Sequence, residues 1–217
     1  QGDQSRLPKN FSVMLFSQLD KITDGKVIQI FHDQPITTLL TDRRKAVISE
    51  GAIFFAIGGL HHNGHQFIPK LYALGIRQFV VESSIPNPGS EANILLVKSS
   101  VSALQKIAAF HRSTVDIPVI GITGSNGKTI IKEWLYQLLS PDYRIAKNPA
   151  SYNSQIGVPL SVWQIQSHHT LGIFEAGIST LHEMGRLQKV LRPTLGIFTN
   201  IGSAHDEGFL NLDEKIN

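Results

Sequence analysis

A glycine-rich segment, Gly121–Thr129, has the residue types that bind nucleotide phosphates. An apolar β-type run precedes it and a helical pattern follows it, so backbone N–H groups can point at an anion. Lys128 offers a cation to the terminal phosphates, and Thr129 offers a hydroxyl to Mg²⁺. Ile122 stands where the usual motif has glycine, so the spacing is a variant. The alternative is an ordinary glycine-rich turn with an exposed lysine. The loop residues expected to bind ATP are Gly124, Ser125, Asn126, Gly127, Lys128 and Thr129.

Polar side chains also follow other apolar runs of the second half. Glu175 ends one run, and a carboxylate near a phosphate loop is a natural Mg²⁺ ligand. Alternatively, backbone N–H groups at a helix start could satisfy it. Asn200 and His205 follow the last run and are candidates for the nucleotide–metal site, although such a histidine can also be a capping or surface residue. Asn153 presents an amide in a short connection.

The second half alternates strand and helix patterns, which predicts a parallel sheet covered by helices. Ligands bind such sheets at the carboxyl ends of the strands, where these polar residues stand. The expected strands are 119–122, 143–146, 171–174 and 195–199, and the expected helices follow residue 127 and span 155–164 and 181–191.

The first half predicts a smaller α/β domain. Its expected strands are 26–31, 38–41, 53–57, 79–81 and 94–97, and its expected helices are 11–19, 64–74 and 101–111. Residues 113–117 read as a linker. We therefore expect a tail at 1–9, a first domain at 10–115, and the first part of a second domain at 116–217.

Composition narrows the function classes. Hydrophobic residues make up 41% of 217 residues, enough for domains with cores. Lys and Arg number 20 against 17 Asp and Glu, so nothing indicates nucleic acid. The absence of cysteine excludes disulfides and is compatible with a reducing cytoplasm. No apolar run approaches the roughly 20 residues of a membrane span. We expect a cytoplasmic protein.

Four motifs together resemble those of the Mur ligases, the ATP-dependent amide ligases of peptidoglycan precursor synthesis. They are Gly121–Thr129, Asn153–Pro159, Glu175–Gly177 and Thr199–His205, in the family's order. The resemblance runs from about residue 10 onward. It implies a small N-terminal UDP-binding α/β domain, followed by a P-loop-type parallel-sheet ATP-binding domain that is truncated at the C-terminus.

Within the family, the chain most resembles members that add D-alanyl-D-alanine to UDP-N-acetylmuramoyl-tripeptide. Segments Lys128–Trp134 and Ser151–Trp163 look closest to a form fused to an alanine racemase. The resemblance implies ATP and Mg²⁺ as cofactors and an acyl phosphate intermediate. It also implies that Lys128 neutralises phosphates and that Asn153 positions the γ-phosphate or metal-bound water. By the same resemblance, Thr129 would bind one Mg²⁺, and Glu175 and His205 would hold a second near the acyl phosphate.

The resemblance further implies a UDP-substrate site in the first domain. The expected residues are Asp42, Arg43, Arg44, Asn63, Gly64 and His65. Arg43 stands where the family has serine, and Asn63 where it has aspartate, so the uridine contact is in question. Ile130 replaces a second threonine, and we expect little effect.

Two histidine patterns do not predict zinc sites. His61, His62 and His65 lie in a loop without a cysteine or carboxylate partner. His182-Glu183 lacks the second histidine of a zincin helix, because Arg186 occupies that position.

The family's carbamylated lysine is expected just beyond Asn217, so Lys215 is not a candidate, and a third domain is expected beyond it. We therefore expect that this chain cannot ligate by itself. The alternatives are a sister ligase that adds the third peptide residue, a folylpolyglutamate-type synthase, and a non-catalytic nucleotide-binding module. A GTPase is disfavoured because the sequence has no Asn-Lys-x-Asp motif.

Overall fold

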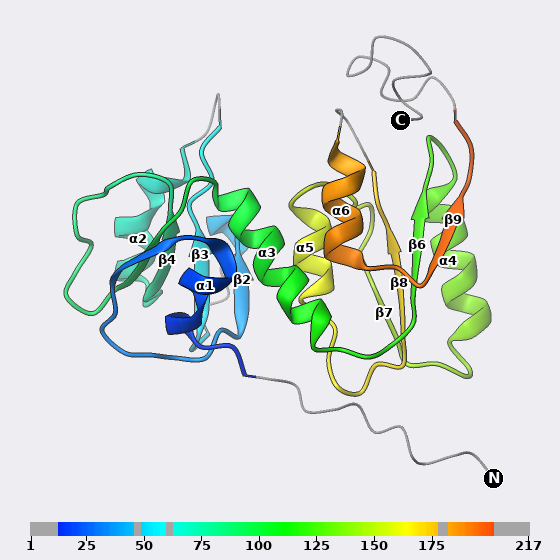
Figure 1. The fold of residues 1–217 in the computed structure, drawn as a ribbon, viewed down its shortest axis with the longest axis horizontal. Helices are drawn as coiled ribbons and strands as arrows, with labels where there is room; N and C mark the ends of the chain where they lie inside the picture. Colours follow the sequence, from blue (N-terminus) through cyan, green and yellow to red (C-terminus); the bar gives the residue numbers. More distant parts are fainter. Residues whose placement is uncertain (1–12, 46–48, 60–62, 178–181, 202–217) are drawn as a thin grey trace. The chain divides into compact units, whose positions relative to one another are not determined.

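The computed structural model describes residues 13–45, 49–59, 63–177 and 182–201. They divide into two compact α/β units, one ending at Ile107 and one beginning at Ala108 (Figure 1). The division lies inside helix α3 (Ser100–Ser113), so one continuous helix contributes to both units. Among the described helices, none has the length and apolar character needed to cross a membrane.

The first unit is built on a five-stranded sheet with strand order β1-β5-β4-β3-β2. Strand β1 is antiparallel to its neighbour, whereas the other four strands run parallel. The carboxyl ends of those four strands therefore lie along one edge. The strands are β1 (Lys26–Gln29), β2 (Thr38–Leu40), β3 (Ala52–Phe55), β4 (Gln78–Val81) and β5 (Asn93–Leu96).

Helix α2 (Ile68–Ala73) covers one face of this sheet. Its Ile68 and Leu71 pack in a buried cluster with Phe54 and Phe79. The expected helix 64–74 is instead a 3-10 turn, η3 (Gly64–Phe67), followed by α2. Pro69 stands in the first turn of α2, where a backbone N–H would have no partner within the helix. A proline at this position favours the start of a new helix, which explains the break after η3.

The N-terminal helix also differs from expectation. It comprises η1 (Phe16–Gln18) and α1 (Leu19–Thr23), later than the expected 11–19, of which residues 11 and 12 lie outside the described part. Asp24 ends it with a left-handed φ of 57°. Another 3-10 turn, η2 (Arg43–Lys45), follows β2.

The second unit confirms the predicted parallel sheet. Its strands are β6 (Val119–Thr123), β7 (Ile145–Lys147), β8 (Leu171–Glu175) and β9 (Leu195–Phe198), in the order β7-β8-β6-β9. All the pairings are parallel. Ile122 pairs with Glu175, and Thr123 with Phe198, so the ends of the three strands stand at one level.

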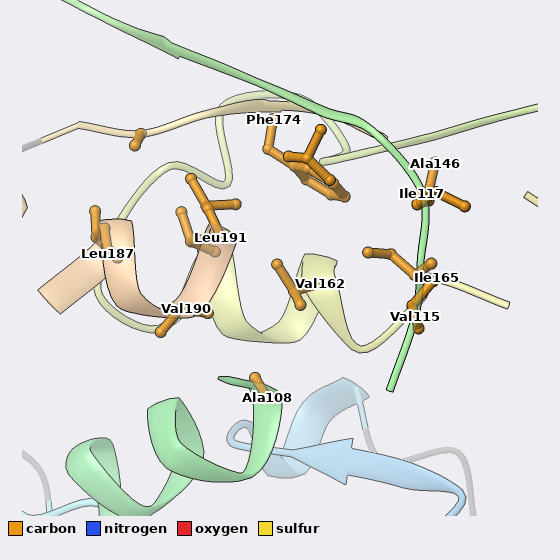
Figure 2. Close-up of a cluster of buried hydrophobic side chains, with 13 residues drawn as sticks. Ala108, Val115, Ile117, Ala146, Val162, Ile165, Phe174, Leu187, Val190 and Leu191 are labelled. Atoms are coloured by element: carbon orange, nitrogen blue, oxygen red, sulfur yellow. The ribbon is translucent and has the colours of Figure 1, made fainter. Parts of the chain in front are cut away.

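Helices cover both faces of this second sheet (Figure 1). Helix α4 (Lys128–Leu139) packs Ile131, Leu135 and Leu139 against one face. Helices α5 (Gly157–Val162) and α6 (Glu183–Leu191) pack against the other, and Figure 2 shows their side chains gathered around Phe174. Burying each such side chain contributes about 1.5–3 kcal/mol, so this packing holds the strand ends in place.

The segment expected as a linker, 113–117, is part of the second unit's core. Val115 and Ile117 are buried, and their carbonyls accept hydrogen bonds from the guanidinium of Arg112 at 2.7 and 3.1 Å. Arg112 also donates to Leu191 O at the end of α6. A buried arginine thus satisfies several backbone carbonyls at once, which spacing along the sequence could not reveal.

Candidate nucleotide-binding site

The phosphate loop lies between β6 and α4, and two glycines shape it for different reasons. Gly124 has a φ of 130°, and a Cβ there would overlap Thr199 Oγ1 and lie 2.9 Å from Asn200 N. Gly127 has a φ of 81°, with no described atom within 4 Å of such a Cβ. Gly124 therefore permits close approach of the neighbouring loop, whereas Gly127 needs only left-handed freedom.

The loop after β9 holds the phosphate loop. Asn200 O accepts from Ser125 N at 2.8 Å, and Asn200 Oδ1 accepts from Asn126 N at 3.0 Å. Thr199 Oγ1 donates to Asn126 O at 2.6 Å. Asn200 thus shapes the phosphate loop by accepting from two N–H groups of that loop. The predicted contact of Asn200 with a nucleotide stays a prediction.

Lys128 lies folded across the loop that precedes it. Its Nζ donates to Gly124 O at 2.6 Å and to Ser125 O at 3.2 Å, and the side chain is only 9% exposed. Burial lowers the pKa of Lys128, while the negative charge of Glu175 acts in the opposite direction. The ammonium group of Lys128 is therefore partly dehydrated and held against the backbone of the phosphate loop. Thr129, next in sequence, is exposed.

Glu175 is entirely buried at the end of β8. Asn148 holds its backbone on both sides, accepting from Glu175 N at 3.0 Å and donating to Glu175 O at 2.9 Å. Asn153 Nδ2 donates to Glu175 Oε1 at 3.2 Å. Oε2 has no hydrogen-bond partner among the described residues. Among the described residues, no backbone N–H group donates to this carboxylate; residues 178–181, where the helix-start alternative would place its donors, lie outside the described part.

Lys132 is a site residue that sequence reasoning missed. It is entirely buried, and its Nζ lies 3.8 Å from Glu175 Oε2. Nζ donates to Asn148 O at 3.0 Å and to Ala150 O. Its position four residues after Lys128, on the same side of α4, was the signal available in the sequence.

These groups fit a hard divalent cation bound together with phosphates. A buried carboxylate oxygen without a donor calls for an explanation, and oxygen is the ligand that Mg²⁺ prefers. Among the described residues no three His, Cys, Asp or Glu gather as a metal site. Such a cation would thus draw its other ligands from hydroxyl, phosphate and water. His205, like His61 and His62, lies outside the described residues.

The predicted substrate residues after β2 bond to one another or to an aromatic ring. Arg44 donates to both carboxylate oxygens of Asp42, with Nε–Oδ1 at 3.1 Å. The guanidinium of Arg43 lies over the ring of Phe67, 4.7 Å from its centroid. Their contact with a substrate stays a prediction.

Asn63 and His65 form a chain of hydrogen bonds at the same sheet edge. Asn63 Oδ1 accepts from His65 N at 3.0 Å and contacts His65 Nδ1 at 2.8 Å. His65 Nε2 accepts from Glu82 N at 2.9 Å, which places the ring proton on Nδ1. Toward the described residues the Asn63 side chain acts as an acceptor through Oδ1, and an aspartate oxygen could accept the same bonds. Gly64 leaves no room for a Cβ, which would lie 2.7 Å from Ile57 N.

The second unit thus defines a P-loop-type nucleotide-binding protein, with a glycine loop at the centre of a parallel sheet and a buried carboxylate on the adjacent strand. Residues 122–217 match the family model of the Mur ligase middle domain. The chain belongs to the Mur ligase family.

Individual relatives agree with this assignment. The chain is 32% identical over 165 residues to UDP-N-acetylmuramoyl-tripeptide–D-alanyl-D-alanine ligase of Bacillus subtilis, covering 76% of the chain and 36% of the relative. It is similar to the crystal structure of MurF from Acinetobacter baumannii, with a TM-score of 0.84, 29% identity, and 94% and 45% of the two chains covered.

A third relative was solved with a nucleotide. The MurF ligase of Thermotoga maritima in complex with ADP has a TM-score of 0.70 and 30% identity, covering 79% of this chain and 39% of that one. The chain thus spans less than half the length of each of these relatives.

Proposed function

We propose that this chain is part of an ATP-dependent ligase that adds D-alanyl-D-alanine to UDP-N-acetylmuramoyl-tripeptide in peptidoglycan precursor synthesis. The observation that carries the proposal is the register of β6 and β8. It sets the phosphate loop with Lys128 beside the buried Glu175, whose Oε2 has no hydrogen-bond partner in the described structure. The names of the similar proteins supply the substrate class.

The proposed reaction needs positioning and charge stabilisation rather than a covalent nucleophile. A carboxylate oxygen of the peptide attacks the γ-phosphorus of ATP, ADP departs, and an acyl phosphate forms. The amine of D-alanyl-D-alanine then attacks the acyl carbon, loses a proton, and phosphate leaves. Lys128 would stabilise charge on the transferred phosphoryl group. The loop N–H groups other than those of Ser125 and Asn126, which donate to Asn200, would orient this group.

Thr129 would bind one Mg²⁺, Glu175 and His205 would hold a second, and Asn153 would keep the Glu175 carboxylate in place. The buried Oε2, which has no hydrogen-bond partner among the described residues, supports this role for Glu175, whereas the role of His205 rests on the resemblance alone. When bound, Mg²⁺ would neutralise phosphate charge in the transition state.

The first unit would bind the UDP end of the substrate. Its candidate residues follow parallel strands and so stand at one sheet edge; they are Asp42, Arg43, Arg44, Asn63, Gly64 and His65. The Phe67 ring fixes the position of the Arg43 guanidinium, which stacks on it. The family has serine at the position of Arg43. Arg43→Ser is expected to change the KM for the UDP substrate and leave the KM for ATP unchanged.

The test is phosphate release by the polypeptide at its natural length, with Mg²⁺-ATP, UDP-N-acetylmuramoyl-tripeptide and D-alanyl-D-alanine. The comparison reaction uses the dipeptide precursor and a diamino acid. Turnover only in the first reaction is expected. Turnover only in the second would assign the chain to the sister ligase instead. ADP binding without either turnover would favour a non-catalytic nucleotide-binding module.

Three further expectations belong to the proposal. The 217-residue chain should bind nucleotide without ligating, because it spans less than half of its relatives, and turnover by it would refute this. We expect the protein to act in the cytoplasm. A fused alanine racemase would appear as racemisation of alanine by the natural-length polypeptide.

A further inference from the structure

Lys132 has the most unusual environment of any lysine in the described structure. Its side chain is entirely buried, which is rare for lysine unless its charge is paired. Its Nζ stands 3.8 Å from Glu175 Oε2, beyond hydrogen-bonding distance, although the two charges attract. The same Nζ lies 3.6 Å from Glu133 Oε1, on a side chain that is 39% exposed.

The hydrogen bonds of Lys132 go to backbone carbonyls instead. Nζ donates to Asn148 O at 3.0 Å and to Ala150 O, both in the connection that follows β7. Ala150 has a left-handed φ of 45°, an uncommon conformation for a non-glycine residue. The lysine therefore fixes the path of this connection from within helix α4.

The same connection holds the buried carboxylate. Asn148 makes two hydrogen bonds to the backbone of Glu175, and Asn153 Nδ2 donates to Glu175 Oε1. Three segments are thus joined: Lys132 ties α4 to the connection after β7, and Asn148 and Asn153 tie that connection to the end of β8. Glu175 Oε2 remains buried with no hydrogen-bond donor among the described residues.

We propose that Lys132 is a positioning residue for metal binding. It holds the Asn148–Asn153 connection so that Glu175 presents Oε2 to a divalent cation bound with the nucleotide. This rests on the proposed function, in which Glu175 is a metal ligand. Groups that orient a ligand in this way set metal affinity, and their loss typically costs about 10–100-fold.

A positioning role and a purely electrostatic role of Lys132 predict opposite effects of its removal on cation affinity. If Lys132 acted only through its charge, its removal would strengthen cation binding, because a like charge would be gone. If it positions Glu175, its removal weakens cation binding. Arginine keeps the charge, but its planar guanidinium cannot occupy the same pair of carbonyls without displacing them.

The experiment measures Mn²⁺ affinity of the ADP-bound natural-length polypeptide by electron paramagnetic resonance, and ADP affinity without metal by calorimetry. Lys132→Met is expected to weaken Mn²⁺ binding about tenfold or more, and Lys132→Arg by a smaller factor. Metal-free ADP affinity should stay as in the unmodified protein. Lys147→Met is the matched control, because Lys147 in neighbouring β7 pairs with Glu133 and lies over the Tyr136 ring. It should change neither affinity.

The outcomes separate the inference from the proposed function. Mn²⁺ affinity that rises in Lys132→Met, or is unchanged in both Lys132 variants, overturns the positioning role. If Lys132→Met does not fold, Lys132→Arg decides: weaker Mn²⁺ binding supports the role, and unchanged binding overturns it. An unmodified protein that binds neither ADP nor Mn²⁺-ADP overturns the proposed function itself.

Discussion

The two sheets carry polar residues at their carboxyl edges in contrasting ways. In the first unit, Asp42 pairs with Arg44, and Asn63 and His65 bond to each other. In the second unit, Glu175 and Lys132 are entirely buried, 3.8 Å apart. The side chains named at the first edge are partly or fully exposed and bond to one another. The second edge buries opposite charges and leaves one carboxylate oxygen without a hydrogen-bond donor among the described residues.

The contrast has an energetic meaning. Charges near water interact weakly and lose little when a partner is removed. Charges removed from water bear a large desolvation cost, so a buried pair is retained where its arrangement serves a purpose or is expensive to break. We therefore expect the second edge to respond strongly to substitution and the first edge weakly.

The largest expected effect is on the buried pair. Glu175→Gln removes the buried one of the two carboxylates near Lys132 and leaves only the partly exposed Glu133, so we expect a loss of about 3 kcal/mol in the free energy of unfolding. Urea denaturation checks this. Asp42→Asn, which breaks the exposed pair of the first unit, should give no measurable loss. Similar losses in both variants would remove the contrast between the two edges.

The next effect concerns the two loop glycines. Gly124→Ala would combine left-handed strain with overlap on the loop after β9, and we expect a loss of about 2–4 kcal/mol together with loss of ADP binding. Gly127→Ala meets only strain, so about 1 kcal/mol is expected. Thermal unfolding and calorimetric titration with ADP measure both. The idea of a Gly124-specific close approach fails if the two variants behave alike.

A smaller effect is expected at the first edge. Asn63→Ala removes the side-chain acceptor at the start of η3 and should cost about 1 kcal/mol. Asn63→Asp keeps the acceptor and should be neutral or slightly stabilising. The pair of variants is compared by denaturant midpoint. A clear loss in Asn63→Asp would show that the amide N–H₂ has a role that the hydrogen bonds described above do not reveal.

The smallest effect is a pH dependence of the second unit. Burial lowers the pKa of His111, opposed by its hydrogen bond to Ile165 O and reinforced by the charge of Arg112. The unfolded chain then takes up the proton first, so stability is present above about pH 6.5 and falls as pH drops from there toward the folded-state pKa.

His111→Gln tests this dependence, because a glutamine amide can still donate to the carbonyl but does not titrate. The loss of unfolding free energy between pH 7 and 5 should be smaller in His111→Gln than in the unmodified chain. Equal losses would assign the acid sensitivity between pH 7 and 5 to other groups, such as His169, whose pKa is also lowered by burial.

The alternation of strands and helices and the glycine loop followed from the sequence, whereas the start of the first helix and the break between η3 and α2 did not. Alternating patterns predicted the parallel sheet of the second unit, and the glycine loop was correctly placed between a strand and a helix. Glu175 was expected at the end of an apolar strand, and it ends β8, while its role as a metal ligand stays a prediction. These features depend on residues close in sequence, since backbone periodicity and turn chemistry are local.

Only the tertiary structure decided which groups meet. Lys132 reaches Glu175 because β8 lies beside β6, and Asn200 closes on the phosphate loop because β9 lies on the other side. The packing of 113–117 depends likewise on Arg112 reaching the end of α6. These partners are far apart in sequence, and strand order selects them. The strands, the helices and the phosphate loop were therefore determined by residues close in sequence. The buried charge pair, in contrast, exists because of the order of the strands within the sheet.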